Sequence, residues 1–445
     1  MAQPVAFSFR GPPPILGQAG LCFALHVFLT STGAGANALE TYVGRADTNY
    51  TWKIIDQKHT EGAALAHLEM ISQQWRDHPW LHHMQIVTPD KVRNPHLAFL
   101  FVTGDGEGRS SIAMLQLIAE RAGALAAVVS RVPNQPLYDG RKEDALIAYT
   151  FDQYLKSGDE SWPLLFPMVK SAVRAMDTVQ AFAQKEHQPK VEAFVVSGMS
   201  KRGWTTWLTG AVDPRVKGIA PMVIDTLNMR TQAVWAEKVY GKQSEKVKDY
   251  SDYNLFEKVD APEMVKLRGW VDPYSYRQRY NMPKLILLGT NDPYWTVDSL
   301  RHYWDDLPGP KLVFQTPNAG HDLAGAKDAK QTLAAFVQMI ADGQELPKME
   351  WSFKNGEKAE VALTVKPPAK SARLWVADST DRDFRNEHFY ATELEIKPRN
   401  NQIVGEVKPP GSGYRAYLAE VVLTSPDGHE YKLSTEARVT PDNIK

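Results

Sequence analysis

A serine flanked by glycines stands where an apolar strand is predicted to turn into a helix. The apolar segment 191–197 runs into Gly198-Met199-Ser200-Lys201-Arg202-Gly203, and a helical pattern follows over 204–211. A nucleophile elbow needs this order, because the turn strains the serine and only small residues fit beside it. The second glycine comes one position later than in the usual G-x-S-x-G pattern. A loop serine that only caps the helix is the alternative, but the context favours a nucleophile.

Two later loops supply the partners that a serine nucleophile requires. Asp292 follows the apolar run 284–288, and His321 follows the next one, 311–314. A serine hydroxyl needs a base to accept its proton, and the order serine, acid, histidine is that of α/β-hydrolase triads. Both loops should open at the carboxyl ends of parallel strands, where ligands bind. We therefore predict that His321 accepts the Ser200 proton and that Asp292 orients the imidazole.

Two other carboxylates compete with Asp292 for the orienting role. Asp225 ends the strand expected over 216–224, a position that some hydrolases use for their acid. Asp322 adjoins His321 but shares its loop, so its side chain is expected to point away. The spacing favours Asp292 over both.

An oxyanion hole needs two backbone N–H groups directed at the developing charge. We expect one from Lys201, directly after the nucleophile, and the other from Gly104, in the glycine-rich loop after the apolar run 96–103. No G-K-[ST] follows these glycines, which disfavours a phosphate-binding loop.

Three polar groups near these motifs have competing interpretations. The cations of Lys201 and Arg202 indicate either an acidic substrate or, more in keeping with such pairs, plain solvent exposure or a salt bridge. The charged run 138–144 either reaches the rim of the site or begins a solvated helix. A third group, His78, His82 and His83, lacks the H-E-x-x-H form, and we expect neither a metal nor a cofactor.

The surrounding pattern predicts an α/β fold. Apolar strands alternate with amphipathic helices between about 96 and 342, as in a parallel sheet covered on both faces. We expect a hydrolase domain over 39–347, with a helical cap inserted at 225–282. The cap is rich in aromatic residues, and Trp270 and Tyr274 are candidates for substrate binding, although such rings can equally pack the cap's own core. Short alternating runs over 348–445 predict a small antiparallel β-sandwich domain.

Composition and the N-terminus limit the function classes. Lys and Arg number 51 against 52 Asp and Glu, so no basic excess favours nucleic acid. A single cysteine excludes a disulfide within the chain. Residues 1–38 have one arginine, an apolar stretch and Ala36-Asn37-Ala38, which is typical of a signal peptide rather than a short membrane anchor. We expect a secreted or periplasmic protein whose mature chain, from Leu39, does not insert stably into membranes; nothing in the sequence specifies an oligomeric state.

The elbow sequence also resembles a known family. Val-Val-Ser-Gly-Met-Ser200-Lys-Arg-Gly-Trp-Thr-Thr-Trp, Gly-Thr-Asn-Asp292-Pro-Tyr-Trp and Leu39-Glu-Thr-Tyr-Val are similar to segments of the PhoPQ-activated pathogenicity-related proteins, a family with a secreted autocrine proliferation repressor. The resemblance covers nearly the whole chain after residue 38. It implies a secreted protein of the α/β-hydrolase superfamily, with Ser200, Asp292 and His321 as the triad, and no particular substrate. A local similarity links the elbow to glucuronoyl esterases.

The sequence thus predicts a secreted serine hydrolase that forms an acyl-enzyme, with an esterase favoured. Its partner would be a small-molecule or peptide substrate. A serine peptidase of the prolyl-oligopeptidase kind and a non-catalytic signalling or binding protein remain the alternatives.

Overall fold

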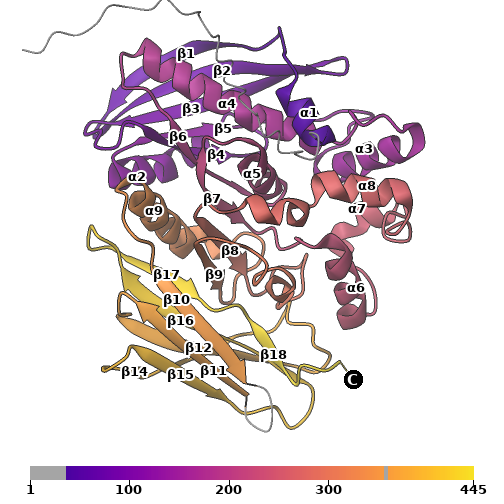
Figure 1. Cartoon of the computed structure of the whole chain (residues 1–445), viewed down its shortest axis with the longest axis vertical. Coiled ribbons are helices and arrows are strands. Elements are labelled where there is room, and N and C mark those ends of the chain that lie inside the picture. Colours follow the sequence, from indigo (N-terminus) through magenta and orange to yellow (C-terminus); the bar gives the residue numbers. More distant parts are fainter. Residues whose placement is uncertain (1–36, 355–358, 445) are drawn as a thin grey trace, which may run out of the picture. The chain divides into compact units, whose positions relative to one another are not determined.

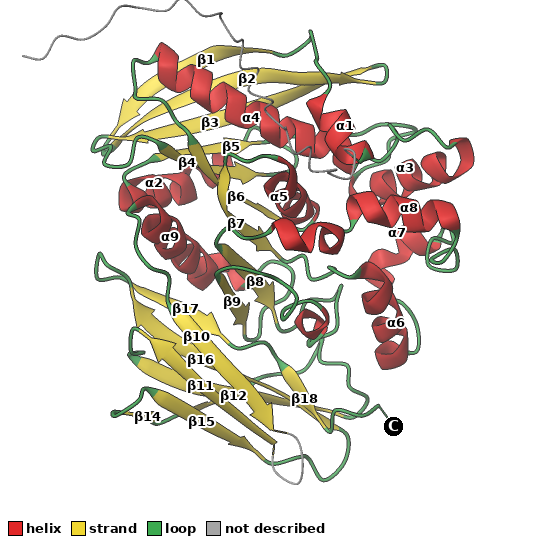
Figure 2. Cartoon of the chain, viewed as in Figure 1, coloured by secondary structure: helices red, strands yellow, loops and turns green. Residues whose placement is uncertain are grey.

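A mixed sheet organises the larger part of the protein (Figures 1 and 2). The computed structural model describes residues 37–354 and 359–444. In these ranges the sheet has nine strands in the order β1-β2-β3-β5-β4-β6-β7-β8-β9, antiparallel from β1 to β5 and parallel from β5 to β9. The strands are β1 (Thr51–Thr60), β2 (Ala63–Trp75), β3 (His78–Pro89), β4 (Leu97–Val102), β5 (Leu125–Val129), β6 (Ala193–Met199), β7 (Val216–Met222), β8 (Lys284–Gly289) and β9 (Lys311–Thr316).

Helices cover both faces of this sheet. In Figure 1, α4 (Leu165–Lys185) and α5 (Lys201–Val212) lie on one side, and α2 (Ile112–Ala122) and α9 (Lys327–Ala341) on the other. Strand β4 is buried at every position, with Ala98, Leu100 and Val102 in one core and Leu97, Phe99 and Phe101 in the other. A strand covered on both faces has no polar side, which is why its sequence is an unbroken apolar run.

This strand order, with a strand-turn-helix at β6, is an α/β-hydrolase fold, so the predicted fold class is confirmed. The long antiparallel strands β1 to β3 were not predicted. Most residues of β1 are exposed, so its sequence lacks the apolar run by which buried strands are found.

The insertion between β7 and β8 is helical, as expected. It contains α6 (Met229–Tyr240), η2 (Glu245–Val247), α7 (Lys248–Ser251), α8 (Pro262–Val271) and η3 (Pro273–Arg279). Its inner residues, among them Leu255, Met264 and Leu267, belong to the same apolar core as α4 and α5. The cap therefore shares its packing with the main domain. The helix α3 (Glu143–Ser157) lies beside it (Figure 1).

After Lys348 the chain forms antiparallel sheets. In the described residues, one sheet has the order β10-β11-β15-β14 and the other β13-β12-β16-β17, with β18 paired to β16. Strand β11 alternates buried and half-buried residues, as a sandwich strand should. The bounds are β10 (Lys348–Lys354), β11 (Ala359–Lys366), β12 (Ser371–Ser379), β13 (Tyr390–Glu393), β14 (Ile396–Lys397), β15 (Gln402–Val407), β16 (Tyr414–Thr424), β17 (Glu430–Ser434) and β18 (Arg438–Thr440).

The first described element is α1 (Ala38–Gly44). Asn37 caps it, with a reciprocal pair of hydrogen bonds to Glu40, and Asn37 Nδ2 also donates to the Tyr276 hydroxyl at 2.8 Å. The predicted signal peptide lies outside the described residues except for Asn37 and Ala38, so its predicted end falls at the first residue of α1. No helix of the described ranges is long and apolar enough to span a bilayer.

Candidate active site

Ser200 lies on a strained turn between β6 and α5. Its φ and ψ are 56° and −124°, a conformation that non-glycine residues rarely adopt, and its N–H donates to Met222 O at 2.9 Å. The glycines on either side explain how the turn fits. A Cβ on Gly198 would lie 2.6 Å from Arg202 O, and one on Gly203 would lie 2.8 Å from Met222 O. The displaced second glycine thus allows α5 to pack closely against β7.

His321 and Asp292 lie within hydrogen-bonding distance. His321 Nδ1 is 2.8 Å from Asp292 Oδ2, and Asp292 is buried while the His321 side chain is 25% exposed. The other carboxylate oxygen accepts from Tyr294 N at 3.0 Å. Within the described part of the chain, His321 Nε2 has no hydrogen-bond partner. An imidazole held at Nδ1 by a carboxylate presents Nε2 as its proton acceptor.

Tyr294 connects this pair to the elbow. Its ring lies 4.4 Å from the imidazole of His321, measured between centroids, and 5.9 Å from Lys201 Nζ, directly after Ser200. The Tyr294 ring therefore lies beside both the imidazole and the Lys201 side chain, and the structure gives Ser200 no hydrogen bond to His321 in the described residues.

The acid and histidine loops also contact each other directly. Asn291 N donates to Ala319 O at 2.9 Å, and Asn318 N donates to Thr290 Oγ1 at 2.9 Å. Gly289 ends β8 where a Cβ would lie 2.3 Å from Ala319 O. Only a glycine allows this approach, which brings the two loops side by side.

The competing carboxylates have other partners. Asp225 is buried and accepts from the Tyr303 hydroxyl at 2.7 Å. Burial raises the pKa of Asp225 to about 8, which keeps it protonated at neutral pH. Asp322 is exposed and accepts from Ala324 N at 3.1 Å. The structure gives neither of them a hydrogen bond to His321 in the described residues.

The two cations after Ser200 are paired inside the protein. Lys201 Nζ lies 2.8 Å from Asp144, and Arg202 binds both oxygens of Glu143 at 2.6 and 2.7 Å. Burial alone would raise the pKa of Glu143, but the Arg202 guanidinium outweighs it and holds that pKa at about 2. The charged run 138–144 therefore reaches the elbow, and the salt-bridge interpretation of these cations holds.

The backbone groups expected to form the oxyanion hole lie on two sides of the elbow. Lys201 is the first residue of α5, where N–H groups have no acceptor within the helix. Gly104 follows β4, and its Cα lies so close to the Arg202 guanidinium that a Cβ would be 2.5 Å from Nη2. Arg202 also donates to Val132 O at 2.5 Å, so it packs the Gly104 loop against the elbow.

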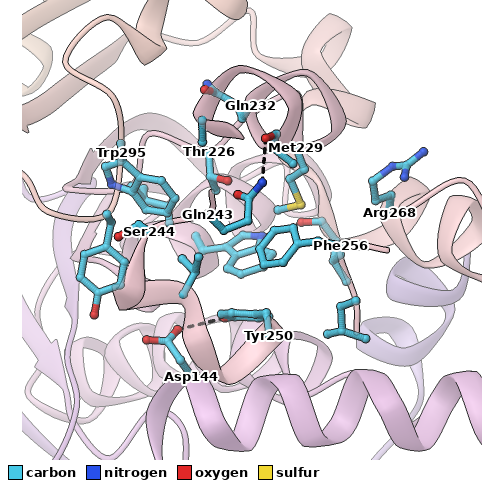
Figure 3. Close-up of a pocket in the computed structure, with 18 of the residues that line it drawn as sticks. Asp144, Thr226, Met229, Gln232, Gln243, Ser244, Tyr250, Phe256, Arg268 and Trp295 are labelled. Atoms are coloured by element: carbon cyan, nitrogen blue, oxygen red, sulfur yellow. Dashed lines mark hydrogen bonds between the residues drawn. The ribbon is translucent and has the colours of Figure 1, made fainter. Parts of the chain in front are cut away.

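A cavity of about 160 Å³ opens beside Ser200 and runs under the cap (Figure 3). Neither Trp270 nor Tyr274 is among the residues that line it. Trp270 is buried against Tyr154 and Phe166, because its side of α8 faces the core. Tyr274 bonds Asp306 through its hydroxyl at 2.6 Å. The substrate-binding role of these two residues therefore stays a prediction, and other cap residues line the cavity.

The three histidines on β3 do not converge. His82 is buried and bonds Ser72 Oγ at 2.9 Å and Ser130 O at 3.1 Å, and burial lowers its pKa to about 4. His83 Nδ1 lies 3.2 Å from His67 Nε2, whereas the His78 ring contacts the Tyr138 ring. Residues of this kind that could jointly hold a metal are not found in the described ranges.

Sequence reasoning missed Tyr294, Asn291 and Asn318. All three stand within three residues of a predicted triad member, so their position was the available indication. The contacts that hold Asn291 and Asn318 come from the loop 380–389, which no local pattern connects to the site.

The fold and the elbow define this protein as a member of the α/β-hydrolase superfamily. The chain belongs to the family of PhoPQ-activated pathogenicity-related proteins, whose model matches residues 39–385. Autocrine proliferation repressor protein A of Dictyostelium discoideum is 30% identical to it over an alignment that covers 91% of each chain. The resemblance inferred from the motifs is therefore confirmed.

Solved structures similar to this chain include an acetyl xylan esterase and an S-formylglutathione hydrolase. Acetyl xylan esterase from Paenibacillus sp. R4 is 14% identical, with a TM-score of 0.49 over 66% of this chain and 91% of that one. S-formylglutathione hydrolase from Agrobacterium tumefaciens is 14% identical, with a TM-score of 0.42 over 65% and 96%. These similarities are remote, so the function is argued below from the chain's own residues.

Proposed function

We propose that this protein is a serine hydrolase that cleaves carboxylic esters through an acyl-enzyme on Ser200. The observation that carries the proposal is the hydrogen bond between His321 and Asp292, which leaves Nε2 of the imidazole without a partner in the described residues. The strained conformation of Ser200, at φ 56°, supports it, because strain of this kind concentrates at functional sites.

The residues act in two stages. The Ser200 hydroxyl attacks the ester carbonyl carbon while His321 Nε2 takes its proton, and Asp292 stabilises the imidazolium. The N–H groups of Lys201 and Gly104 receive the developing oxyanion. The protonated imidazole then donates to the leaving alcohol. Water repeats the sequence on the acyl-enzyme and releases the acid.

The pairing of the charges around Ser200 favours an ester over a peptide. A peptidase of the prolyl-oligopeptidase kind uses an acidic pair to bind the substrate amine, and the acids near the elbow, Glu143 and Asp144, are engaged by Arg202 and Lys201. A non-catalytic role is the other candidate, since the Dictyostelium relative is named for the repression of proliferation. We also propose export of the protein to the cell exterior or periplasm, from the pattern of residues 1–38.

Labelling with a fluorophosphonate tests the proposal, together with turnover of a p-nitrophenyl ester panel and an aminoacyl amide panel. The wild-type protein should label and hydrolyse esters faster than amides. Ser200→Ala should no longer label, and its kcat for esters should be lower by roughly 10⁴-fold or more. Ser197→Ala, three residues earlier on β6, is the matched control and should retain both. Labelling of Ser200→Ala at the wild-type rate would show that the nucleophile is a different residue, and absence of both activities in the wild type would favour the non-catalytic role.

A further inference from the structure

Apolar side chains of the cap line part of the cavity beside Ser200. Leu255, Met264 and Leu267 are buried in the core that the cap shares with the main domain, and each reaches the cavity. Met229 and Phe256, both labelled in Figure 3, add half-buried apolar surface. This part of the wall therefore suits a ligand group without charge.

Several polar side chains that line the cavity have donors already committed to the protein, whereas the Trp295 indole Nε1, also at the cavity, has no partner in the described residues. Gln232, Gln243 and Ser244 donate to backbone carbonyls at 2.7 to 3.0 Å. The Tyr250 hydroxyl donates to Asp144 at 2.9 Å, as the dashed line in Figure 3 shows. A sugar needs partners for its many hydroxyls, and these four committed donors are not available to it.

The charged groups on the wall do not offer a site for an ion. Asp144 is neutralised by Lys201 at 2.8 Å. The Arg268 guanidinium donates to Val259 O and lies at the periphery of the group in Figure 3. An apolar ligand group avoids the cost of displacing these contacts.

We propose that this cavity binds the apolar chain or ring of an ester substrate, of about six carbon atoms. The size follows from the volume of about 160 Å³, because an apolar cavity of about 150 Å³ accepts benzene. This inference rests on the proposed esterase function and specifies its substrate class. The apolar group can belong to the acid or to the alcohol, and the experiment separates the two.

Two ester series test the size and polarity of the group. One varies the acyl chain from acetate to decanoate on p-nitrophenol, and the other varies the alcohol of acetate esters from methyl to hexyl. In one series kcat/KM should rise by up to about fourfold per methylene until about six carbons, and then level or fall. The series that rises identifies which side of the ester occupies the cavity. Flat profiles in both series, or a maximum at the shortest chain in both, would overturn the inference.

A substitution that fills the cavity with a larger side chain tests the same inference. Leu267→Trp should lower the ratio of kcat/KM for the six-carbon over the two-carbon substrate by at least about tenfold, since the indole occupies the space of the chain. Val265 is exposed on the same helix, so Val265→Trp should leave the ratio unchanged. Met264→Phe is a milder second variant, should Leu267→Trp not fold.

The outcome separates this inference from the proposed function. If Ser200 labels and esters are turned over while Leu267→Trp and Met264→Phe leave the ratio within twofold, the cavity assignment is wrong and the esterase stands. If Ser200 neither labels nor supports turnover, both fail.

A second, independent set of contacts joins the C-terminal sandwich to the acid loop. Asn291, directly before Asp292, donates through Nδ2 to the carbonyls of Phe384 at 2.9 Å and Glu387 at 2.7 Å. Both acceptors belong to the loop 380–389, between β12 and β13. At the far end of the acid loop, Asp298 forms an ion pair with Arg382 of the same loop, as described below.

The same sandwich loop also holds the histidine loop. Asn318 Nδ2 donates to Phe389 O at 2.9 Å, and Phe389 N donates to Asn318 Oδ1 at 2.7 Å. Asn318 precedes His321 by three residues. A two-bond clamp of this kind fixes the backbone from which the imidazole projects.

We infer that Asn318 and Asn291 are positioning residues, through which the loop 380–389 sets the distance between His321 and Asp292. The sandwich then helps to position the catalytic residues. This second inference also rests on the proposed function. Misplacement of a catalytic group by about 1 Å can cost about 10²-fold in rate. Asn318→Ala should therefore lower kcat by about 10- to 100-fold with KM within twofold, and Asn318→Asp, which keeps the acceptor, should lower it less.

A second clamp between the same regions supplies the control. Thr332 Oγ1 of α9 donates to Lys432 O and accepts from Lys432 N, both at 3.1 Å, on β17. Thr332→Val removes this clamp without touching the catalytic loops, and should lower the melting temperature but leave kcat within twofold. If folded Asn318→Ala and Asn318→Asp both retain wild-type kcat, or if Thr332→Val loses kcat equally, the positioning role is overturned.

Discussion

The cap and the C-terminal sandwich both reach the catalytic loops, but they do so with different chemistry. The cap contributes buried apolar side chains such as Leu267, whereas the sandwich contributes backbone carbonyls and the buried cation of Arg382. Apolar surface discriminates ligands by size, and hydrogen bonds fix geometry because they are directional. We propose on this basis that substrate choice and catalytic alignment belong to separate parts of the chain.

The two regions are not independent, since one buried ion pair contacts both. Asp298 lies between Arg382, at 2.9 Å, and the Trp235 indole of the cap, which donates to it at 3.1 Å. Burial alone would raise the pKa of Asp298, but the attraction of Arg382 outweighs it and lowers that pKa to about 2. This junction is where a variant can show whether the two roles separate.

The largest effect is expected at Asp292, which lies in the loop that the sandwich contacts through Asn291, and it is compared with that at Asp225, at the base of the cap. Asp292→Asn should lower kcat by about 10⁴-fold, because the imidazole loses the acid that sets its tautomer. Asp225→Asn should lower it less than tenfold, since Asp225 bonds Tyr303 rather than His321. Steady-state kinetics on one ester decide the matter, and the reverse ranking would move the acid to the strand before the cap.

The second-largest effect is expected on the free energy of unfolding, when the ion pair between Asp298 and Arg382 is removed. Arg382→Met leaves Asp298 buried without its main partner, which should cost about 3 to 5 kcal/mol of unfolding free energy. The depressed pKa of Asp298 means that this stability is fully present above about pH 4 and is lost as the pH falls through about 2. The wild-type contribution of Asp298 should therefore be constant between pH 5 and 8 in denaturant titrations.

The same variant sharpens the division of roles. Arg382→Met should lower kcat while the chain-length ratio stays at the wild-type value, because the apolar wall of the cavity is untouched. A shift of the ratio with unchanged kcat would reverse the assignment. Arg385→Met, which removes a contact to Glu245 of the cap, is the matched comparison.

A pH effect of intermediate size should arise at the base of the cap. Asp225 stays protonated in the folded protein up to about pH 8, whereas in the unfolded chain it ionises near pH 4. The folded state thus binds the extra proton, and the stability due to Asp225 is lost as the pH rises through this window. The melting temperature of the wild type should fall by several degrees relative to Asp225→Asn between pH 5 and 8. The exposed Asp322→Asn is the control, and parallel pH profiles for wild type and Asp225→Asn would contradict the assignment.

The smallest effect concerns the elbow, which belongs to neither region. Ser200→Gly and Ser200→Ala should both be inactive, but Gly should be the more stable by about 1 kcal/mol, because it adopts a φ of 56° without the strain of a Cβ. Thermal unfolding of the two purified variants measures this difference. Greater stability of the Ala variant would mean that the turn stores no strain.

The same division explains what the sequence could predict. The elbow, the acid and the histidine are local patterns: each lies directly after an apolar strand, so their residue types and order could be found without coordinates. The fold class followed from strands such as β4, whose burial on both faces leaves an unbroken apolar run. The cap could be predicted from the length of the insertion between β7 and β8.

What the sequence could not predict depends on contacts between distant segments. Asn318 and Phe389 are 71 residues apart, and their clamp joins the Asn318 side-chain amide to backbone groups of Phe389, which carry no residue-type pattern. The aromatic content of the cap suggested Trp270, but the side of α8 that faces the core is decided by tertiary packing. The exposed strand β1 was missed because a strand with few buried residues looks like a polar loop.

Mass spectrometry can test whether Ser200 forms an acyl-enzyme with His321 as base. The protein is quenched in acid during turnover of p-nitrophenyl hexanoate, and its mass is then measured. We expect one added hexanoyl group, mapped by proteolysis to the peptide that contains Ser200. The adduct should be absent from Ser200→Ala and formed far more slowly by His321→Ala. Hydrolysis with no adduct under rapid quenching, or an adduct that persists in Ser200→Ala, would contradict it.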